Sequence, residues 1–81
     1  MSDLIRYLES EGYSDLRETP TAGVVGTMPF LFTHAIVCEM DDFGYGYRFC
    51  YETKCEADGA LSDWAENDYE GEPTGYIVRK G

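Results

Sequence analysis

Residues 30–52 read FLFTHAIVCEMDDFGYGYRFCYE, and this stretch decides the predicted fold. It holds two runs rich in aromatic and β-branched residues, Phe30 to Met40 and Tyr45 to Glu52, with the sequence DDFG between them. Two such runs separated by a polar turn that contains glycine predict a β-hairpin. We therefore expect two neighbouring antiparallel strands in the middle of the chain.

Side-chain alternation restricts the register of this hairpin. Six apolar residues alternate along the two strands: Ile36, Cys38, Met40, Tyr47, Phe49 and Tyr51. A register that places Cys38 opposite Phe49 or Tyr51 puts all six on one face, whereas a shift by one residue would mix the two faces. The opposite face, which includes Glu39 and Arg48, is predicted to be the wetter one.

A short helix is predicted at the start of the chain, over residues 2–13. Ser2 is a good N-cap, apolar residues follow it at helical spacing, and Gly12 is placed to end the helix.

The next segment, residues 14–29, is predicted to be a connector. Two prolines and two glycines, which usually mark turns, occur along it: Pro20, Gly23, Gly26 and Pro29. Only Val24 and Val25 are expected to form a short edge strand there.

A second helix is predicted from Thr53 to about Glu66. The Thr53 hydroxyl and Glu56 fit a capping box at its start. Its buried stripe is expected to consist of Ala57, Ala60, Leu61 and Trp64. Gly59 inside the helix costs about 1 kcal/mol relative to alanine, and a close approach of the helix to the sheet would explain it. Gly75 to Arg79 is predicted as a last short strand.

These elements predict an α+β fold in the order α-β-β-α-β, with two helices on a small, mostly antiparallel sheet of three strands. The connection through the second helix to the last strand is expected to be right-handed, which gives the strand order 2-1-3. Eighty-one residues are too few for two hydrophobic cores, so residues 1–81 are expected to form a single domain.

The second prominent feature of the sequence is its acidity. Sixteen Asp and Glu residues against six Lys and Arg residues give a net charge of −10 at pH 7. Eleven of the acids and two of the bases lie between Glu39 and Glu72, so this part alone has a net charge of −9. Solubility needs a net charge of only about 2–8 in a small domain, and the excess favours a surface that attracts a basic partner. The alternative is an acidic surface that is simply solvated. The same charge argues against DNA, RNA and anionic membranes as direct ligands.

The candidate contact residues are acids and tyrosines of this region. Four acids recur at every second position from Glu66 to Glu72, and in an extended segment their side chains would lie about 6.6 Å apart on one side. That distance is of the same order as the spacing of phosphates along a nucleic-acid strand. Charges steer encounter, and tyrosines often anchor the centre of an interface. The predicted partner-binding residues are Asp41, Asp42, Tyr45, Asp58, Asp63, Glu66, Asp68, Tyr69, Glu70 and Glu72.

Catalytic and metal-binding patterns are weak. His34 with Cys38, Cys50 and Cys55 supplies the ligand types of a zinc site, but His34 and Cys38 would lie about 13 Å apart on a strand. Cys55 in the first turn of a helix favours a thiolate, and His34 is the one histidine available as its base. We expect no metal, no cofactor and no enzymatic activity.

Location is predicted from the cysteines and the N-terminus. Three cysteines, an acidic start and no apolar segment after it favour reduced thiols in a cytoplasm. No stretch approaches the roughly 20 apolar residues of a membrane span.

The combination of 81 residues, a net charge of −10, 7 tyrosines and no catalytic motif resembles the small acidic proteins that phages use against host defences. Anti-CRISPR proteins and DNA-mimic inhibitors belong to this group. The resemblance lies in composition across the whole chain, and it assigns no role to any single residue. It implies a stoichiometric inhibitor, in the cytoplasm of a host bacterial cell, that binds the basic nucleic-acid groove of a CRISPR effector or a similar nuclease. The alternative is a non-inhibitory interaction module that binds a peptide or forms a homodimer through an aromatic patch or a sheet edge.

Overall fold

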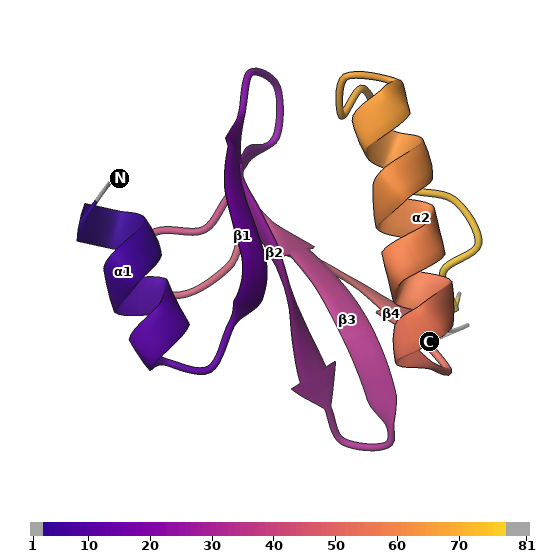
Figure 1. The fold of residues 1–81 in the computed structure, drawn as a ribbon, viewed down its shortest axis with the longest axis horizontal. Coiled ribbons are helices and arrows are strands. Elements are labelled where there is room, and N and C mark those ends of the chain that lie inside the picture. Colours follow the sequence, from indigo (N-terminus) through magenta and orange to yellow (C-terminus); the bar gives the residue numbers. More distant parts are fainter. Residues whose placement is uncertain (1–2, 78–81) are drawn as a thin grey trace.

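The computed structural model describes residues 3–77, which form two helices and a four-stranded antiparallel sheet (Figure 1). The elements are α1 Asp3–Ser10, β1 Ser14–Thr19, β2 Gly23–Phe30, β3 Thr33–Cys38, β4 Tyr47–Tyr51 and α2 Lys54–Glu66. The chain therefore has an α+β fold. The predicted three-stranded sheet of order 2-1-3 and the predicted element order α-β-β-α-β are wrong.

The sheet is a meander, because each strand pairs with the next one in the chain and the strand order is β1-β2-β3-β4. The prediction failed in two segments. Residues 14–29, expected as a connector, form all of β1 and most of β2. The single strand expected from Phe30 to Met40 is divided by a turn, so its start belongs to β2 and its middle to β3.

That turn contains none of the residues that usually mark a turn. Phe30 pairs with Thr33, so Leu31 and Phe32 form a two-residue loop between β2 and β3. Leu31 has a φ of 55°, in the left-handed region that glycine, asparagine or aspartate normally occupies. A continuous run of apolar residues therefore concealed a tight turn.

Glycine and proline inside β2 also misled the prediction. A Cβ atom at Gly26 would lie 2.6 Å from Leu16 Cδ2 and 3.0 Å from the Ser14 carbonyl oxygen, so the Leu16 side chain of β1 occupies the space that a larger residue would need. Pro29 lies beyond Thr27, the last residue of β2 that pairs with β1. Within residues 3–77, no strand pairs with Pro29 on that side, so the N–H that proline lacks is not needed there. Both residues are accommodated within a strand and do not interrupt it.

The β3–β4 hairpin exists, but its predicted register was wrong. Cys38 lies opposite Tyr47 and Ile36 lies opposite Phe49, whereas Cys38 was expected opposite Phe49 or Tyr51. The difference is an even number of residues, so these side chains still share one face.

Met40 departs from the shared face. Glu39 has a φ of 51° and therefore breaks the alternation of the strand. Cys38 consequently packs on one side of the sheet, while Met40 packs on the other side.

The sheet separates two hydrophobic clusters, and Figure 1 shows one helix on either side of it. The α2 face carries a cluster built from Ala22, Val25, Ile36, Cys38, Tyr51, Ala57, Ala60, Leu61 and Trp64. The α1 face carries a cluster built from Leu8, Val24, Ala35, Val37 and Met40. Val24 and Val25 are both buried but belong to opposite clusters, so β2 is an interior strand and not the short edge strand that was expected.

The sequence predicted α2 well. The Thr53 hydroxyl accepts a hydrogen bond from the N–H of Glu56 at 3.1 Å, which is the first of the two bonds of the predicted capping box. The buried residues of the helix are the predicted Ala57, Ala60, Leu61 and Trp64. The explanation offered for Gly59 is wrong, because a Cβ atom there would meet nothing within 4 Å.

The helix at the start of the chain is present but shorter than predicted, since α1 spans Asp3–Ser10. Gly12 has a φ of 102° and donates its N–H to the carbonyl of Glu9 at 3.2 Å, which agrees with its expected role in ending the helix. The predicted N-cap, Ser2, lies outside the described residues.

The last predicted strand is not found in the part of it that the structure describes, residues 75–77. Ile77 donates its N–H to the carbonyl of Cys50 at 2.8 Å. This segment therefore lies beside β4, and not beside β3 as the predicted strand order required. Arg79 lies outside the described residues.

Candidate functional site

Acidic side chains concentrate on α2 and on the loop that follows it. Six are exposed and are termed the α2 acidic surface: Glu56, Asp63, Glu66, Asp68, Glu70 and Glu72. A seventh acid, Asp58, pairs with Lys54 at 2.9 Å. This is the only ion pair found within residues 3–77, so the six carboxylates have no cationic partner in the described part of the chain.

The loop after α2 folds back on the helix. Asp68 donates its N–H to the carbonyl of Ala65 at 3.1 Å, and Tyr69 donates to the carbonyl of Trp64 at 2.9 Å. Asp68 and Tyr69 have φ values of 55° and 58°. The segment is therefore not extended, and the predicted regular spacing of its carboxylates was wrong. The acids are instead distributed around the C-terminal end of the helix.

Tyr69 was predicted as a contact residue, and the structure gives it a role in the fold. Its ring packs edge-on against Trp64 with 5.3 Å between centroids. Its hydroxyl accepts a hydrogen bond from Arg17 Nη1 at 3.1 Å, and its carbonyl accepts one from the Thr21 hydroxyl at 2.8 Å. These contacts hold the loop against β1 and the β1–β2 turn.

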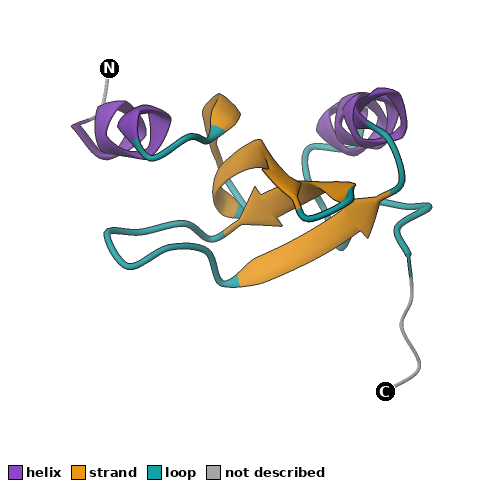
Figure 2. Cartoon of the chain, turned by 90° about the horizontal axis from the view of Figure 1, so that it is seen from below, coloured by secondary structure: helices purple, strands orange, loops and turns teal. Residues whose placement is uncertain are grey.

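Three of the predicted contact residues lie on the opposite side of the sheet from α2. Figures 1 and 2 show that the long β3–β4 loop, which contains Asp41 and Asp42, extends toward α1. Asp41 accepts the N–H of Phe43 at 2.8 Å and so stabilises its own turn. Tyr45 packs against the cluster of the α1 face, and its hydroxyl accepts a hydrogen bond from Arg48 at 2.8 Å. The ten predicted residues therefore form two separate groups.

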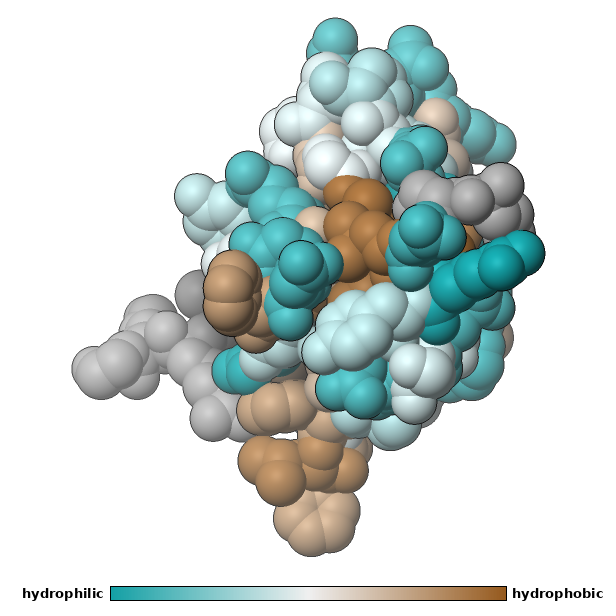
Figure 3. All heavy atoms as spheres, turned by 90° about the vertical axis from the view of Figure 1, so that its left-hand side faces the viewer, coloured by the Kyte–Doolittle hydropathy of each residue, from teal (hydrophilic) through white to brown (hydrophobic). Residues whose placement is uncertain are grey.

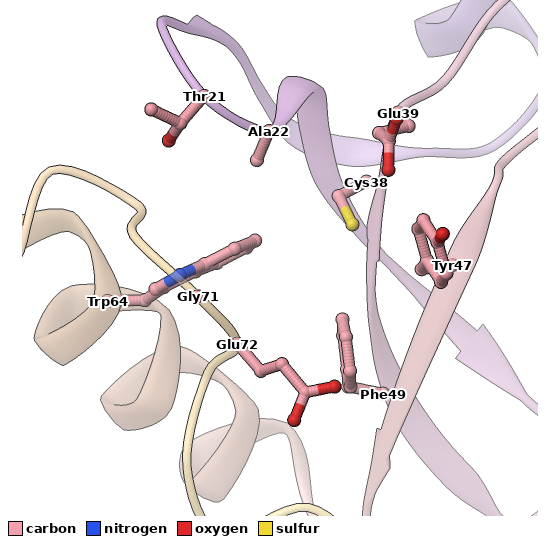
Figure 4. A pocket seen from close by; sticks show the side chains of 9 residues that line it. All are labelled: Thr21, Ala22, Cys38, Glu39, Tyr47, Phe49, Trp64, Gly71 and Glu72. Atoms are coloured by element: carbon pink, nitrogen blue, oxygen red, sulfur yellow. The ribbon is translucent and has the colours of Figure 1, made fainter.

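A cavity of about 260 Å³ opens on the α2 face and is termed the aromatic cavity (Figure 4). The residues that line it are Thr21, Ala22, Cys38, Glu39, Tyr47, Phe49, Trp64, Gly71 and Glu72. They come from the β1–β2 turn, from the end of β3 and the residue after it, from β4, from α2 and from the loop after α2. Of this set, the sequence predicted only Glu72 as a contact residue. The alternation that placed Cys38, Tyr47 and Phe49 on one face was a signal for part of the cavity, but the approach of Trp64 depends on tertiary packing.

The thiol that lines this cavity is a poor nucleophile. Burial, together with the nearby Glu39 carboxylate, raises the pKa of Cys38 to about 11. The thiol is therefore protonated at neutral pH and behaves as a small apolar group.

The other residues considered for thiol or metal chemistry lie on different elements, with no hydrogen bond between Cys55 and His34 among those that the structure shows in the described residues. Cys55 is exposed in the first turn of α2, whereas His34 lies on β3 opposite Tyr51. Within residues 3–77, no group of three or more His, Cys, Asp or Glu side chains is arranged to hold a metal ion.

The turn between β2 and β3 is the most exposed apolar part of the described chain. Leu31 is 82 % exposed and Phe32 is 99 % exposed. This turn lies at the bottom of Figure 1, and Figure 3 shows apolar atoms protruding at the same end of the molecule.

Neither helix within the described residues has the length and apolar content required to cross a membrane.

Comparison of the chain with protein-family models, with curated proteins and with solved structures found no match. The function is therefore inferred from the residues and from the fold alone.

Proposed function

We propose that this protein is a binding protein, and not an enzyme, whose α2 acidic surface engages a basic surface of another protein. The observation that supports this most directly is the set of six exposed carboxylates without an ion-pair partner within residues 3–77. Like charges held close together repel one another, and contact with lysine and arginine side chains relieves that repulsion. Complementary charge of this kind also accelerates encounter.

The proposed partner is a protein that normally binds DNA or RNA. Such a protein neutralises phosphates with lysine and arginine side chains. Carboxylates on a helix can form ion pairs with the same side chains. The proposed consequence is inhibition, because an occupied groove excludes the nucleic acid. A host defence nuclease or a CRISPR effector is the partner class that the resemblance in composition implies.

Competitive binding tests this proposal. The labelled protein is titrated against a panel of purified nucleases and CRISPR effectors, with and without duplex DNA or guide RNA. We expect a 1:1 complex that nucleic acid displaces and whose dissociation constant rises about tenfold or more between 50 and 200 mM salt. Binding that is insensitive to both salt and nucleic acid contradicts the proposal.

Charge reversal locates the surface. The test variant reverses three exposed acids of the α2 acidic surface: Asp63→Lys, Glu66→Lys and Glu70→Lys. The matched control reverses three exposed acids elsewhere: Glu9→Lys, Glu11→Lys and Glu18→Lys. The net charge changes equally, so the test variant is expected to lose binding about 100-fold and the control about threefold at most. Circular dichroism verifies that both variants fold, and an equal loss of binding in both contradicts a local surface.

A second function, an interaction module that uses apolar contact, is supported by the exposed β2–β3 turn. Leu31 and Phe32 place two large apolar side chains at its tip, and Leu31 occupies a backbone conformation that glycine adopts more easily. Sedimentation velocity tests the homodimeric form of this function. A dimer that persists at high salt and dissociates in Phe32→Asn supports it, and a monomer at all concentrations contradicts it.

A further inference from the structure

The aromatic cavity has walls of three rings arranged around an opening. Phe49 and Trp64 meet edge to face, with 6.4 Å between centroids and 71° between planes. Tyr47 on β4 is 58 % exposed and Phe49 is partly buried, whereas Trp64 is 3 % exposed. Tyr47 and part of Phe49 therefore supply the ring surface that a ligand can reach, and Trp64 supports them from the buried side. Figure 4 shows Trp64 on one side of the opening and Tyr47 with Phe49 on the other. Aromatic faces carry negative partial charge, so such walls attract a cation.

Carboxylates stand at two sides of the same opening. Figure 4 shows Glu39 near one end and Glu72 near the other. Both are exposed, and neither has an ion-pair partner within the part of the chain that the structure describes. Glu72 is oriented by the Tyr76 hydroxyl, which donates to its Oε1 at 3.0 Å. The combination of aromatic walls and two unpaired carboxylates selects positive charge.

Glu39 is held at this opening at a cost in backbone strain. Its φ of 51° lies in the left-handed region, where a non-glycine residue is disfavoured. Its N–H donates to the carbonyl of Ala22 at 2.9 Å. A Cβ atom at Gly23 would lie 3.2 Å from Glu39 Cα, and one at Gly46 would lie 3.2 Å from Glu39 Cβ. Two glycines therefore make room for a strained glutamate that lines the cavity.

We propose that the aromatic cavity binds the guanidinium group of an arginine side chain of the partner. This inference rests on the proposed function, because it names the side chain by which a basic partner is anchored. A guanidinium is planar, stacks on aromatic faces and offers five N–H donors, so it can lie against a ring while it donates to a carboxylate at the opening. An ammonium group is compact and more strongly hydrated, so lysine fits this opening less well.

A peptide titration tests the cavity without the partner. The probe is acetyl-Gly-Arg-Gly-amide, and the matched peptides replace arginine with neutral citrulline or with lysine. Trp64 is the one tryptophan of the chain, so its fluorescence reports on the cavity directly. Amide chemical shifts of the ¹⁵N-labelled protein locate the contact. We expect saturable shifts confined to the cavity with arginine, weaker binding with lysine and no saturable binding with citrulline.

Two double variants distinguish specific binding of arginine in the cavity from general attraction of a cation to an acidic protein. Glu39→Gln with Glu72→Gln is expected to weaken arginine binding about tenfold or more, because both carboxylates that can accept a charge-assisted hydrogen bond from the guanidinium are removed. The matched control, Glu56→Gln with Glu66→Gln, removes the same charge elsewhere on the α2 acidic surface and is expected to change binding about twofold at most.

Tyrosine variants test the ring wall without a change in charge. Tyr47→Ala is expected to weaken binding about threefold or more. Tyr7→Ala, at a tyrosine on α1 that is 45 % exposed, is expected to have no effect.

The inference is overturned if citrulline or lysine binds as well as arginine, if the shifts spread over all acidic residues, or if the two glutamine pairs behave alike. These results are distinct from failure of the proposed function. If the charge-reversal variant no longer binds the partner but the Glu39→Gln, Glu72→Gln variant still binds it, the α2 acidic surface is supported and the cavity inference is wrong. If the arginine peptide binds in the cavity but no nucleic-acid-binding protein forms a complex that nucleic acid displaces, the cavity inference is supported and the proposed partner class is wrong.

Discussion

The two faces of the sheet bury apolar residues in different ways. The α1 face is closed mainly by aliphatic side chains such as Leu8, Val24 and Val37, and the cavity beside α1 is about 150 Å³. The α2 face is closed by rings, among them Trp64 and Tyr51, and its aromatic cavity is about 260 Å³. Rings also line the cavity beside α1, among them Tyr7 and Tyr13, but within the described residues no ring belongs to the buried cluster of that face. The face that carries the candidate site thus also carries the larger share of aromatic packing.

The largest loss of stability is expected from substitution of Trp64, a buried aromatic residue of the α2 face. Its ring is 3 % exposed, its Nε1–H donates to the Glu70 carbonyl at 3.1 Å, and it contacts Phe49 and Tyr69. Trp64→Ala is expected to lower the free energy of unfolding by about 3–5 kcal/mol. Urea denaturation followed by circular dichroism measures this, because the fluorescent residue is removed. A loss below about 2 kcal/mol contradicts a central role for the ring.

A smaller loss is expected from the matched change on the other face. Leu8 is 1 % exposed and is the buried residue of the eight-residue helix α1. Leu8→Ala is expected to cost about 2–3 kcal/mol, because so short a helix depends on this contact but can detach without opening the α2 face. Hydrogen exchange tests the difference. Protection should be lost in α1 and retained in α2, and loss throughout both helices would show that the faces unfold as one unit.

Alkaline pH is expected to weaken the α2 face first. Burial, with a contribution from Tyr76, raises the pKa of Tyr51 to about 12. The native state holds the phenol proton more tightly than the unfolded state, whose tyrosine titrates near its ordinary value of about 10. This stabilisation is therefore complete below pH 10 and is lost as the pH rises toward 12, by about 2 kcal/mol. Cys38, with its raised pKa of about 11, contributes in the same direction at a slightly lower pH.

Denaturant midpoints between pH 8 and pH 12 check this dependence. Tyr51→Phe also removes a hydrogen bond to the Thr74 carbonyl, so it should be less stable at pH 8 but show a flatter profile above pH 10. Tyr13 on the α1 face is half-buried, and burial raises its pKa as well. Tyr13→Phe is expected to change the profile less, and the reverse order would contradict the comparison.

The smallest effect is expected from substitution of Gly59, and it is a gain in stability. The residue lies inside α2, is exposed, and has no atom within 4 Å of the position where a Cβ would be. Gly59→Ala is expected to raise the free energy of unfolding by about 0.5–1 kcal/mol, because alanine restricts the unfolded chain and favours the helix. Thermal unfolding measures the gain, and Ser62→Ala on the same helix should give a smaller one. A loss of stability at Gly59→Ala would reveal a steric requirement in the native state.

Local signals in the sequence predicted α2, and long-range packing limited the rest. The cap at Thr53 and the stripe that ends at Trp64 depend only on neighbours within one helix, so spacing was sufficient. Leu31 at a positive φ could not be predicted, because nothing in its side chain favours that conformation. Gly26 was read as a turn because only the approach of Leu16 from β1 shows why a side chain is absent there.

The candidate site was predicted in part for the same reason. Charge density along the chain located the acids of α2 and its loop, but it also grouped them with Asp41 and Asp42, which the β3–β4 loop carries to the other side of the sheet. Glu39 and Tyr47 were not selected, since only the folded hairpin brings them to the cavity that Trp64 closes.

The meander has a consequence for how the chain reaches this fold. Each strand after β1 pairs with the strand that precedes it, so each pairing step closes only one local hairpin loop, the longest of which spans residues 39–46. The entropy lost in closing a loop rises with the logarithm of its length, and sheets built from neighbours in sequence fold faster than those that join distant segments. The sheet is therefore expected to assemble by successive addition of hairpins, on the order of milliseconds. The strained Leu31 turn is then an early kinetic step, because it sets the pairing of the two central strands on which both outer strands are added.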